Sequence, residues 1–191
     1  MTDDIRKRFD ESLQVIGATQ GRLASRIAQA VEVIVQACRG GGGVYLFGNG
    51  GSAADAQHIA CELVGRFLLE RRPLKAQALS ADTSILTAVG NDYGFEHVFA
   101  RQLEAAGRAG DVAVGLSTSG NSANVVAGLA KARQLGMRTI ALTGIGGGQC
   151  AELADVLLDV PCAGPSCRIQ EAHAVIYHVM CELIEAALAQ P

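Results

Sequence analysis

From residue 44 onward, short runs of apolar residues alternate with longer stretches whose apolar positions recur every three or four residues. The first pattern is typical of buried β-strands, and the second of helices that pack one face against a sheet. The alternation predicts a parallel sheet with helices on both faces, connected by right-handed crossovers. The expected strands are 44–47, 76–80, 112–116, 139–143 and 156–160, and the expected helices are 53–69, 83–90, 95–107, 122–136 and 168–189.

Two further helices are predicted before the first strand, over residues 3–19 and 21–38. Apolar residues of the second recur at three- and four-residue steps along one face, at Leu23, Ile27, Val31, Ile34, Val35 and Cys38. Because these helices stand outside the alternation, we expect them to pack across the edge of the sheet or to bind a second copy of the chain. The glycines at 40–43 end the second helix.

The composition fits one domain with a full hydrophobic core. Of the 191 residues 49% are hydrophobic but only 4% are aromatic, so the core must be built from Ala, Val, Ile and Leu. Such residues suit a parallel sheet covered by helices. We expect an α/β fold over 1–191: a three-layer, doubly wound, five-stranded parallel sheet (40–191) preceded by two additional N-terminal helices (1–39).

Charge and cysteine usage exclude several classes of function. The formal net charge is −3 and no basic tract is present, which argues against nucleic acid or an anionic membrane as partner. The charged N-terminus lacks the apolar stretch of a signal peptide, and no run is long enough to span a membrane, so we expect a cytoplasmic protein. The six cysteines are expected to be small buried hydrophobes in a reducing compartment.

A glycine-rich turn, residues 48–52, connects the first expected strand to a helix. Backbone N–H groups at such a turn lack helical partners, and the helix N-terminus adds partial positive charge, so an anion such as phosphate is favoured there. His58 and Glu62 are four residues apart and therefore lie on one face of the new helix. A phosphate cradle with a base or metal ligand on the same helix indicates chemistry on a phosphorylated small molecule.

The same turn also fits the dinucleotide-binding fingerprint, through Gly48, Gly50 and Ala53. A Rossmann fold additionally needs an acidic residue about 20 residues further on, at the end of the second strand. The candidate here, Asp82, comes about 30 residues later. Nicotinamide binding is therefore the weaker interpretation, and no nucleotide cofactor is expected.

A second polar loop follows the third expected strand, with hydroxyls at Ser117, Thr118, Ser119 and Ser122 before the next helix. These hydroxyls, beside free helix N–H groups, offer a dense set of donors to phosphate oxygens. An ordinary serine N-cap is the simpler alternative, but a cap needs only one hydroxyl. Both loops are expected at the carboxyl ends of the strands, where ligands bind in such folds.

The stretch Ser117-Thr118-Ser119-Gly120-Asn121-Ser122 resembles the signature of the sugar isomerase (SIS) domain, a doubly wound fold that binds phosphosugars. A longer match is similar to the bacterial phosphoheptose isomerase family. It covers nearly the whole chain, and its most specific segments are 48–58, 62–67, 91–93 and 168–173. One departure is visible: some members carry an acid where this chain has Cys167.

The resemblance implies a fold, an activity and a set of site residues. Members interconvert sedoheptulose 7-phosphate and D-glycero-D-manno-heptose 7-phosphate, the first step toward nucleotide-activated heptose for lipopolysaccharide, and are homotetramers with sites where subunits meet. The implied proton-transfer pair is Glu62 and His178. The implied zinc ligands are His58, Glu62, Gln170 and His178, and the implied substrate-binding residues are Asn49, Gly50, Gly51, Ser52, Glu62, Asn91, Asp92, Ser117, Thr118, Ser119, Ser122 and Gln170.

Helix geometry leaves alternatives open at the last helix. Gln170 and His178 are eight residues apart, which is ~12 Å along one helix axis. For both to reach one ion, the helix must be interrupted or one side chain must serve a neighbouring subunit, and His173 is a rival ligand. Two other functions also stay open: a non-catalytic SIS regulator that binds the bacterial replication initiator, and an isomerase of another phosphosugar.

Overall fold

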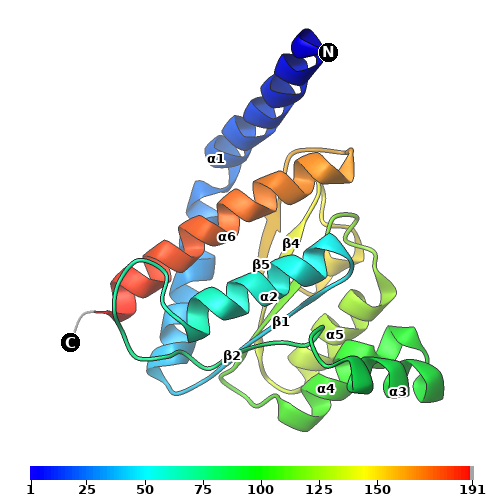
Figure 1. The fold of residues 1–191 in the computed structure, drawn as a ribbon. Helices are drawn as coiled ribbons and strands as arrows, with labels where there is room; N and C mark the ends of the chain where they lie inside the picture. Colours follow the sequence, from blue (N-terminus) through cyan, green and yellow to red (C-terminus); the bar gives the residue numbers. More distant parts are fainter. Residues whose placement is uncertain (190–191) are drawn as a thin grey trace.

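The computed structural model describes residues 1–189, and its centre is a five-stranded parallel sheet in the order β2-β1-β3-β4-β5 (Figure 1). The strands are β1 (Val44–Gly48), β2 (Ala76–Ala78), β3 (Val112–Ser117), β4 (Arg138–Thr143) and β5 (Val156–Asp159). Strand pairing is in parallel register throughout; for example, Leu46 lies opposite Val114, and Val114 opposite Ile140. The predicted doubly wound sheet is confirmed.

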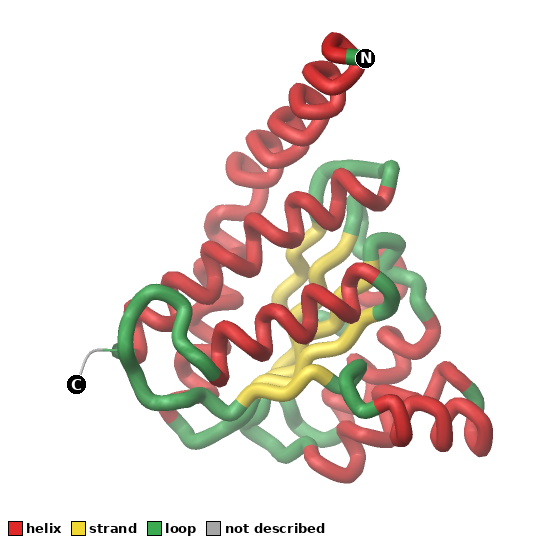
Figure 2. The backbone as a smooth tube through the Cα atoms, viewed as in Figure 1, coloured by secondary structure: helices red, strands yellow, loops and turns green. Residues whose placement is uncertain are grey.

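Helices cover both faces and make three layers (Figures 1 and 2). One face is covered by α1 (Thr2–Arg39), α2 (Gly51–Val64) and α6 (Ser166–Leu188), and the other by α3 (Thr83–Tyr93), α4 (Val98–Ala106) and α5 (Ala123–Gln134). Two short 3-10 helices, Phe95–His97 and Gly148–Glu152, lie in the connections. Within residues 1–189 no helix combines the length and apolar character that a membrane span requires.

The predicted N-terminal pair of helices is wrong: residues 2–39 form one continuous helix. Gly17 and Gly21 flank the expected break at residue 20, but both are helical, and no atom lies near the place where either would carry a side chain. A glycine in a helix costs about 1 kcal/mol relative to alanine, which the burial of Leu23, Ile27 and Ile34 further along the helix offsets. The first half of α1 extends beyond the rest of the chain (Figure 1).

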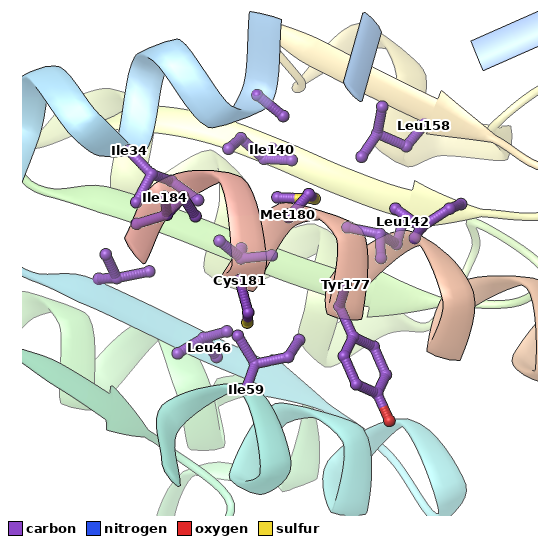
Figure 3. Close-up of a cluster of buried hydrophobic side chains, with 14 of the residues drawn as sticks. Ile34, Leu46, Ile59, Ile140, Leu142, Leu158, Tyr177, Met180, Cys181 and Ile184 are labelled. Atoms are coloured by element: carbon purple, nitrogen blue, oxygen red, sulfur yellow. The ribbon is translucent and has the colours of Figure 1, made fainter. Parts of the chain in front are cut away.

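Two apolar clusters, one on each face of the sheet, hold the layers together. The larger lies between the sheet and α1, α2 and α6, and Figure 3 shows part of it. The other joins the sheet to α4 and α5 and includes Phe47 and Phe99, whose ring centroids are 5.2 Å apart with the planes tilted by 32°. Each is built mainly from aliphatic side chains, as the low aromatic content predicts. Burial on this scale is the main source of stability for a domain of this size.

The strand order reverses direction between β1 and β3, its two neighbouring central strands. Connections leave these strands toward opposite faces, with α2 on one face and α5 on the other, so a crevice opens beyond their carboxyl ends. The predicted glycine-rich and hydroxyl-rich loops are those that follow β1 and β3. The topology therefore brings them together.

Candidate active site

The loop after β1 turns sharply at Gly50, whose φ of 56° is a conformation that residues with a side chain rarely adopt. The turn leads into α2, and no side chain caps that helix. Gly51 has no side chain, and the Gln170 amide occupies that space: a Cβ on Gly51 would lie 2.6 Å from Gln170 Nε2. An uncapped helix N-terminus beside an amide is a site suited to an anion.

The loop after β3 gathers its hydroxyls as predicted. Ser117 Oγ lies 2.9 Å from Ser122 Oγ and 3.5 Å from Ser119 Oγ. Ser122 stands at the N-cap position of α5 but makes no capping hydrogen bond with its side chain. The ordinary N-cap interpretation therefore does not describe this loop. Its hydroxyls face one another at an uncapped helix N-terminus and remain available to a ligand's oxygens.

A pair of amides joins the two loops. Asn49 Nδ2 donates to Asn124 Oδ1, and Asn124 Nδ2 donates to Asn49 Oδ1, both at 2.8 Å. The resemblance implies that Asn49 contacts the substrate, and the structure shows that its side chain also joins the loop after β1 to the first turn of α5, directly after the hydroxyl loop. Ser52, a predicted substrate contact as well, is only 4% exposed beneath the turn. Its hydroxyl is not presented at the surface of the loop.

Three of the side chains that were predicted to take part in the reaction lie together where α2 and α6 run side by side (Figure 1). His58 Nε2 is 3.0 Å from Glu62 Oε1, and the His58 and His178 rings meet edge to face at 5.0 Å. The Glu62 side chain is 19% exposed and that of His58 is 44% exposed, so a solute can reach both. This group, His58 with Glu62 and His178, combines a carboxylate with two imidazoles, which are the groups needed for proton transfer.

Sequence reasoning missed two residues that support this group. Tyr177 lies at the edge of the large core with its hydroxyl directed toward α2 (Figure 3), 3.2 Å from His58 Nδ1. Burial, together with the charge of Asp55, raises the pKa of Tyr177 to about 12. Asp55 precedes His58 by three residues, so helical spacing on α2 was the available signal. Tyr177 was hidden among apolar neighbours on α6.

These contacts bear on the tautomer of the His58 ring. Its Nδ1 lies 3.2 Å from the Tyr177 hydroxyl, and its Nε2 lies 3.0 Å from a carboxylate oxygen of Glu62. A carboxylate oxygen only accepts, so either Nε2 carries a hydrogen that it donates to Glu62, or Nδ1 carries it and a cation lies between Nε2 and the carboxylate. In the second form His58 and Glu62 are both able to bind a metal ion.

Other predicted residues lie elsewhere in the chain. Gln170 contacts Gly51, which is seven residues and ~10 Å along α2 from His58. Because α6 is uninterrupted from Ser166 to Leu188, Gln170 and His178 occupy different ends of the crevice. His173 is no rival ligand: it is fully buried, and its Nε2 lies 3.1 Å from Thr143 O.

Asn91 and Asp92 lie near the end of α3 on the opposite side of the sheet, bonded to each other at 2.7 Å. No residue of α3 is buried. The resemblance assigns both side chains to the substrate, and no hydrogen bond among residues 1–189 joins either of them to the two loops of the crevice.

The residues that the structure describes include no preformed cluster of three or more His, Cys, Asp and Glu side chains arranged to hold a metal ion. The group His58, Glu62 and His178 nevertheless fits zinc by its chemistry, because two imidazoles with a carboxylate are a common ligand set for a catalytic zinc ion. The structural feature that supports this fit is the pairing of His58 Nε2 with a Glu62 carboxylate oxygen at 3.0 Å, which places two candidate ligand atoms side by side.

The structure defines a class of domain: a doubly wound sheet with a hydroxyl-rich loop at the point where the strand order reverses. Comparison with known proteins identifies the same class. The model of the SIS domain family matches residues 9–144. The phosphoheptose isomerase of Aquifex aeolicus is 53% identical over 190 residues, which cover 100% of this chain and 99% of that protein.

Solved structures agree with this match. A phosphoheptose isomerase from Neisseria gonorrhoeae superimposes with a TM-score of 0.91 at 46% identity, over 97% of this chain and 98% of that one. One from Francisella tularensis gives 0.92 at 39% identity over the same shares. This chain therefore belongs to the SIS domain family and, within it, to the phosphoheptose isomerase family.

Proposed function

We propose that this protein is an aldose–ketose isomerase that interconverts sedoheptulose 7-phosphate and D-glycero-D-manno-heptose 7-phosphate, the first step toward nucleotide-activated heptose. The observation that carries the proposal is the meeting of His58, Glu62 and His178 on two facing helices, in a fold whose neighbouring strands also carry a cradle of serine hydroxyls. The high identity to phosphoheptose isomerases over the whole chain supports the substrate.

The two ends of the crevice have different roles: one binds the phosphate, and the other carries out the proton transfers. Ser117, Ser119 and Ser122, with the uncapped N-terminus of α5, bind the phosphate. Gln170, beside Gly51, contacts the sugar between the phosphate and the reacting carbons. Because ~10 Å of α2 separates Gly51 from His58, the substrate must be elongated. A seven-carbon chain with a terminal phosphate meets that requirement better than a short sugar phosphate.

Glu62 and His178 carry out the proton transfers. The Glu62 carboxylate removes the proton from C1 of the ketose, which gives an enediol, and returns it to C2 to form the aldose. His178 moves the second proton between the oxygens on C1 and C2. Glu62 Oε1 lies beside His58, and Oε2 accepts no hydrogen bond from any residue among 1–189, so Oε2 is the atom that takes the proton. Removing either group is expected to abolish turnover.

The proposal includes one zinc ion per subunit, held by His58, Glu62 and His178. When bound, the metal would polarise the substrate oxygens and stabilise the enediolate charge. A carboxylate can bind a metal through one oxygen and leave the other as a base, so Glu62 can serve both roles. Gln170 is assigned to the substrate rather than the metal within one chain, because it lies with Gly51.

We also propose a homo-oligomer, a tetramer by the family resemblance, whose sites are completed across subunits. Asn91 and Asp92 lie on a helix with no buried residue in a single chain, so another subunit can cover that helix. Exposed apolar residues on α1 and α6 support further contacts. The absence of basic tracts and membrane-spanning segments from the described residues leaves the small-molecule substrate and other copies of the chain as the expected partners, in the cytoplasm.

The direct test is conversion of sedoheptulose 7-phosphate by the purified protein supplied with zinc, followed by NMR of the sugar phosphates. Glu62→Gln should lower kcat by about 10²–10⁴-fold, the usual contribution of a general base, and should leave the fold intact. Glu32→Gln, which changes an exposed carboxylate on α1, is the matched control and should keep wild-type activity. Near-normal turnover by Glu62→Gln would place the base elsewhere.

No observation favours the non-catalytic regulator, because the proton-transfer pair is present and the similar proteins are isomerases. Binding to a replication initiator without any sugar conversion would reverse this choice. Comparing rates on five-, six- and seven-carbon ketose phosphates distinguishes phosphoheptose isomerase from an isomerase of another phosphosugar. We expect the seven-carbon substrate to give the highest kcat/KM.

A further inference from the structure

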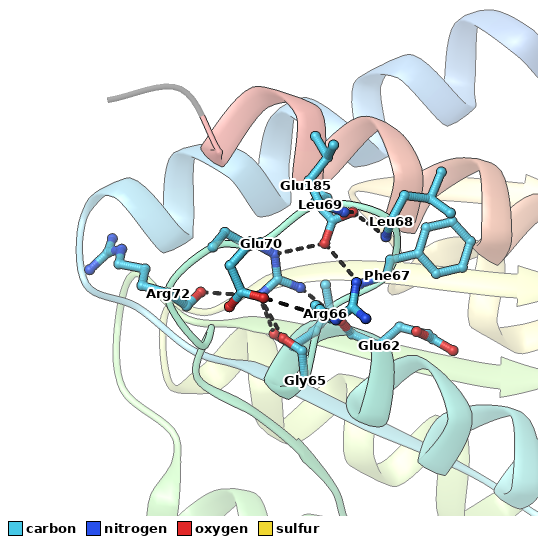
Figure 4. A network of polar contacts seen from close by, with 11 residues as sticks. Glu62, Gly65, Arg66, Phe67, Leu68, Leu69, Glu70, Arg72 and Glu185 are labelled. Atoms are coloured by element: carbon cyan, nitrogen blue, oxygen red, sulfur yellow. Dashed lines mark hydrogen bonds and ion pairs between the residues drawn. The ribbon is translucent and has the colours of Figure 1, made fainter.

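A buried carboxylate far along the sequence holds the loop that follows α2. This loop, residues 65–75, has no regular secondary structure. Glu185 of α6 is 1% exposed and accepts three consecutive backbone N–H groups of the loop: those of Phe67 at 2.8 Å, Leu68 at 2.5 Å and Leu69 at 2.7 Å (Figure 4). Consecutive N–H groups converging on one point form an anion-binding nest. Here the nest is occupied by a carboxylate of the same chain, that of Glu185.

Arg71, from the same loop, balances the buried charge. Its side chain is 2% exposed, and its Nε lies 3.3 Å from Glu185 Oε1, an ion pair without the alignment of a hydrogen bond. Its two terminal nitrogens donate to carbonyl oxygens at the end of α2 and in the loop, namely those of Glu62, Leu63, Gly65 and Arg72. Burial raises the pKa of Glu185, but the three N–H groups and Arg71 together lower it below its usual value.

This buried pair contacts the candidate active site at two points. Phe67, held by Glu185 through its N–H group, stacks its ring on the His178 imidazole at 5.8 Å with 22° between the planes. Arg71 Nη2 donates to the backbone carbonyl of Glu62 at 2.7 Å. Each member of the proposed proton-transfer pair is thus contacted by a residue of the loop that Glu185 and Arg71 fix.

We propose that Glu185 and Arg71 are positioning residues of the isomerase: by folding the loop, they press Phe67 against one face of His178 and fix the turn of α2 that carries Glu62. The proposal rests on the proposed function for its catalytic consequence. Neither residue touches the substrate, because both side chains are buried beneath the loop. Their effect must therefore appear in kcat rather than in substrate binding.

The first test compares Glu185→Gln with Glu182→Gln, an exposed carboxylate on the same helix that should behave as wild type. A glutamine keeps one acceptor oxygen but loses the charge opposite Arg71. In Glu185→Gln we expect a kcat lowered at least about tenfold, with KM changed less than about twofold, since a small misplacement of reacting groups has effects of this size. Amide hydrogen exchange at residues 67–69 should become at least about tenfold faster.

The second test separates positioning of His178 from general loosening. The ring current of Phe67 changes the NMR chemical shifts of the His178 ring. In Glu185→Gln these chemical shifts should therefore move toward the values that they have in Phe67→Leu. Phe67→Leu keeps the loop's backbone bonds and should lower kcat as well, whereas Phe67→Tyr, which keeps the aromatic face, should restore it. The double variant should be little worse than Glu185→Gln alone, because both changes break one chain of contacts.

Several outcomes would overturn the proposal. One is faster exchange at 67–69 with wild-type kcat. Another is a lowered kcat with unmoved His178 signals. If Glu185→Gln does not fold, Phe67→Leu decides, and a wild-type kcat in that variant refutes the role of the loop. If the wild-type protein itself shows no isomerase turnover, the proposed function fails. Amide hydrogen exchange at residues 67–69 and the NMR signals of the His178 ring then decide whether Glu185 positions the imidazole.

Discussion

The serine hydroxyls after β3 stand close enough to one another to act as one binding surface. Ser117 is 3% exposed and bonds Ser122, while Ser119 is exposed and its Oγ accepts from the Asn121 N–H group. Ser119 is therefore the hydroxyl placed to meet a ligand directly. Ser117, besides its proposed contact with the phosphate, holds Ser122 in position through the contact between their hydroxyls.

Ser119→Ala is accordingly expected to weaken phosphate binding more than catalysis. A hydrogen bond to a charged group contributes about 1.5–3 kcal/mol, so KM should rise roughly 10- to 100-fold while kcat changes little. Steady-state kinetics with the sugar phosphate measure both constants. Ser25→Ala, an exposed serine on α1, is the control. A fall in kcat at constant KM would contradict a role in holding the phosphate throughout the reaction.

His173 provides a pH-dependent prediction at the residue scale. It is fully buried, and burial lowers its pKa from 6.5 to about 4. Between these values the unfolded chain binds a proton that the folded chain does not, so the free energy of unfolding rises with pH across this window and the contribution is complete above pH 6.5. Lowering the pH from 6.5 to 4 should cost up to about 3 kcal/mol.

Urea unfolding at several pH values measures this dependence. In His173→Gln, which has no titrating group at this position, the slope of stability against pH between 4 and 6.5 should become shallower by up to one proton. An unchanged slope would show that His173 titrates alike in the folded and unfolded chain. The variant is expected to be less stable than wild type at every pH because Thr143 O loses a well-placed partner.

Sequence motifs predicted which polar side chains gather after β1 and β3, but not the residues that hold them in place. The hydroxyl loop and the pair His58 and Glu62 follow from local spacing, because a loop or a helix face is defined by neighbours in sequence. The Asn49–Asn124 pair joins residues 75 apart, and Glu185 bonds a loop 118 residues away. Contacts over such separations depend on strand order and on helix pairing. A single sequence does not encode them in any local pattern.

At the scale of elements, α2 and α6 cooperate because they run in the same direction over one face of the sheet (Figure 1). Gln170 meets Gly51 near their N-terminal ends, and His178 meets His58 about two turns later. The helix pair thus separates the proposed phosphate end of the crevice from the proposed catalytic end. The geometric conflict over Gln170 was predictable from helix rise alone, whereas its contact with Gly51 was not.

Tyr177→Phe tests how this helix pair orients His58. Residues that hold the second nitrogen of a metal-bound histidine commonly change metal affinity 10- to 100-fold when removed. We therefore expect the zinc dissociation constant to rise roughly 10-fold, measured by competition with a chelating dye. Tyr93→Phe, an exposed tyrosine on α3, is the control and should leave the affinity unchanged. Wild-type affinity in Tyr177→Phe would show that the hydroxyl does not set the form of the His58 ring.

Boundaries of elements were predicted less well than their order. The α2 helix ends at Val64 instead of 69, because Gly65 and the Glu185 contacts turn the following residues into a loop. The predicted helix 95–107 begins with a 3-10 turn and is α-helical only over Val98–Ala106. In both cases tertiary contacts outweighed the local helical pattern.

At the scale of the whole molecule, the chain leaves an apolar surface on α1 and α6 uncovered. Ile5, Phe9 and Leu13 are between 52 and 67% exposed and recur every four residues on the part of α1 that extends beyond the body. Nearby, α1 and α6 border an apolar groove of about 420 Å³ lined by Ile27, Ile176 and other aliphatic residues. The extended tip contacts little of its own chain, so another copy is the natural partner for it.

Phe9→Asp should therefore dissociate the oligomer without unfolding the subunit. Burying a phenylalanine contributes about 1.5–3 kcal/mol for each copy, so losing it from two copies and adding a charge should raise the dissociation constant at least about 100-fold. Light scattering after size-exclusion chromatography measures the mass. Gln14→Asp adds the same charge on the far side of α1 and should keep the wild-type mass. If Asn91 and Asp92 complete a neighbour's site, isomerase activity should fall as Phe9→Asp is diluted, whereas a fully active monomer would show that each chain contains its whole site.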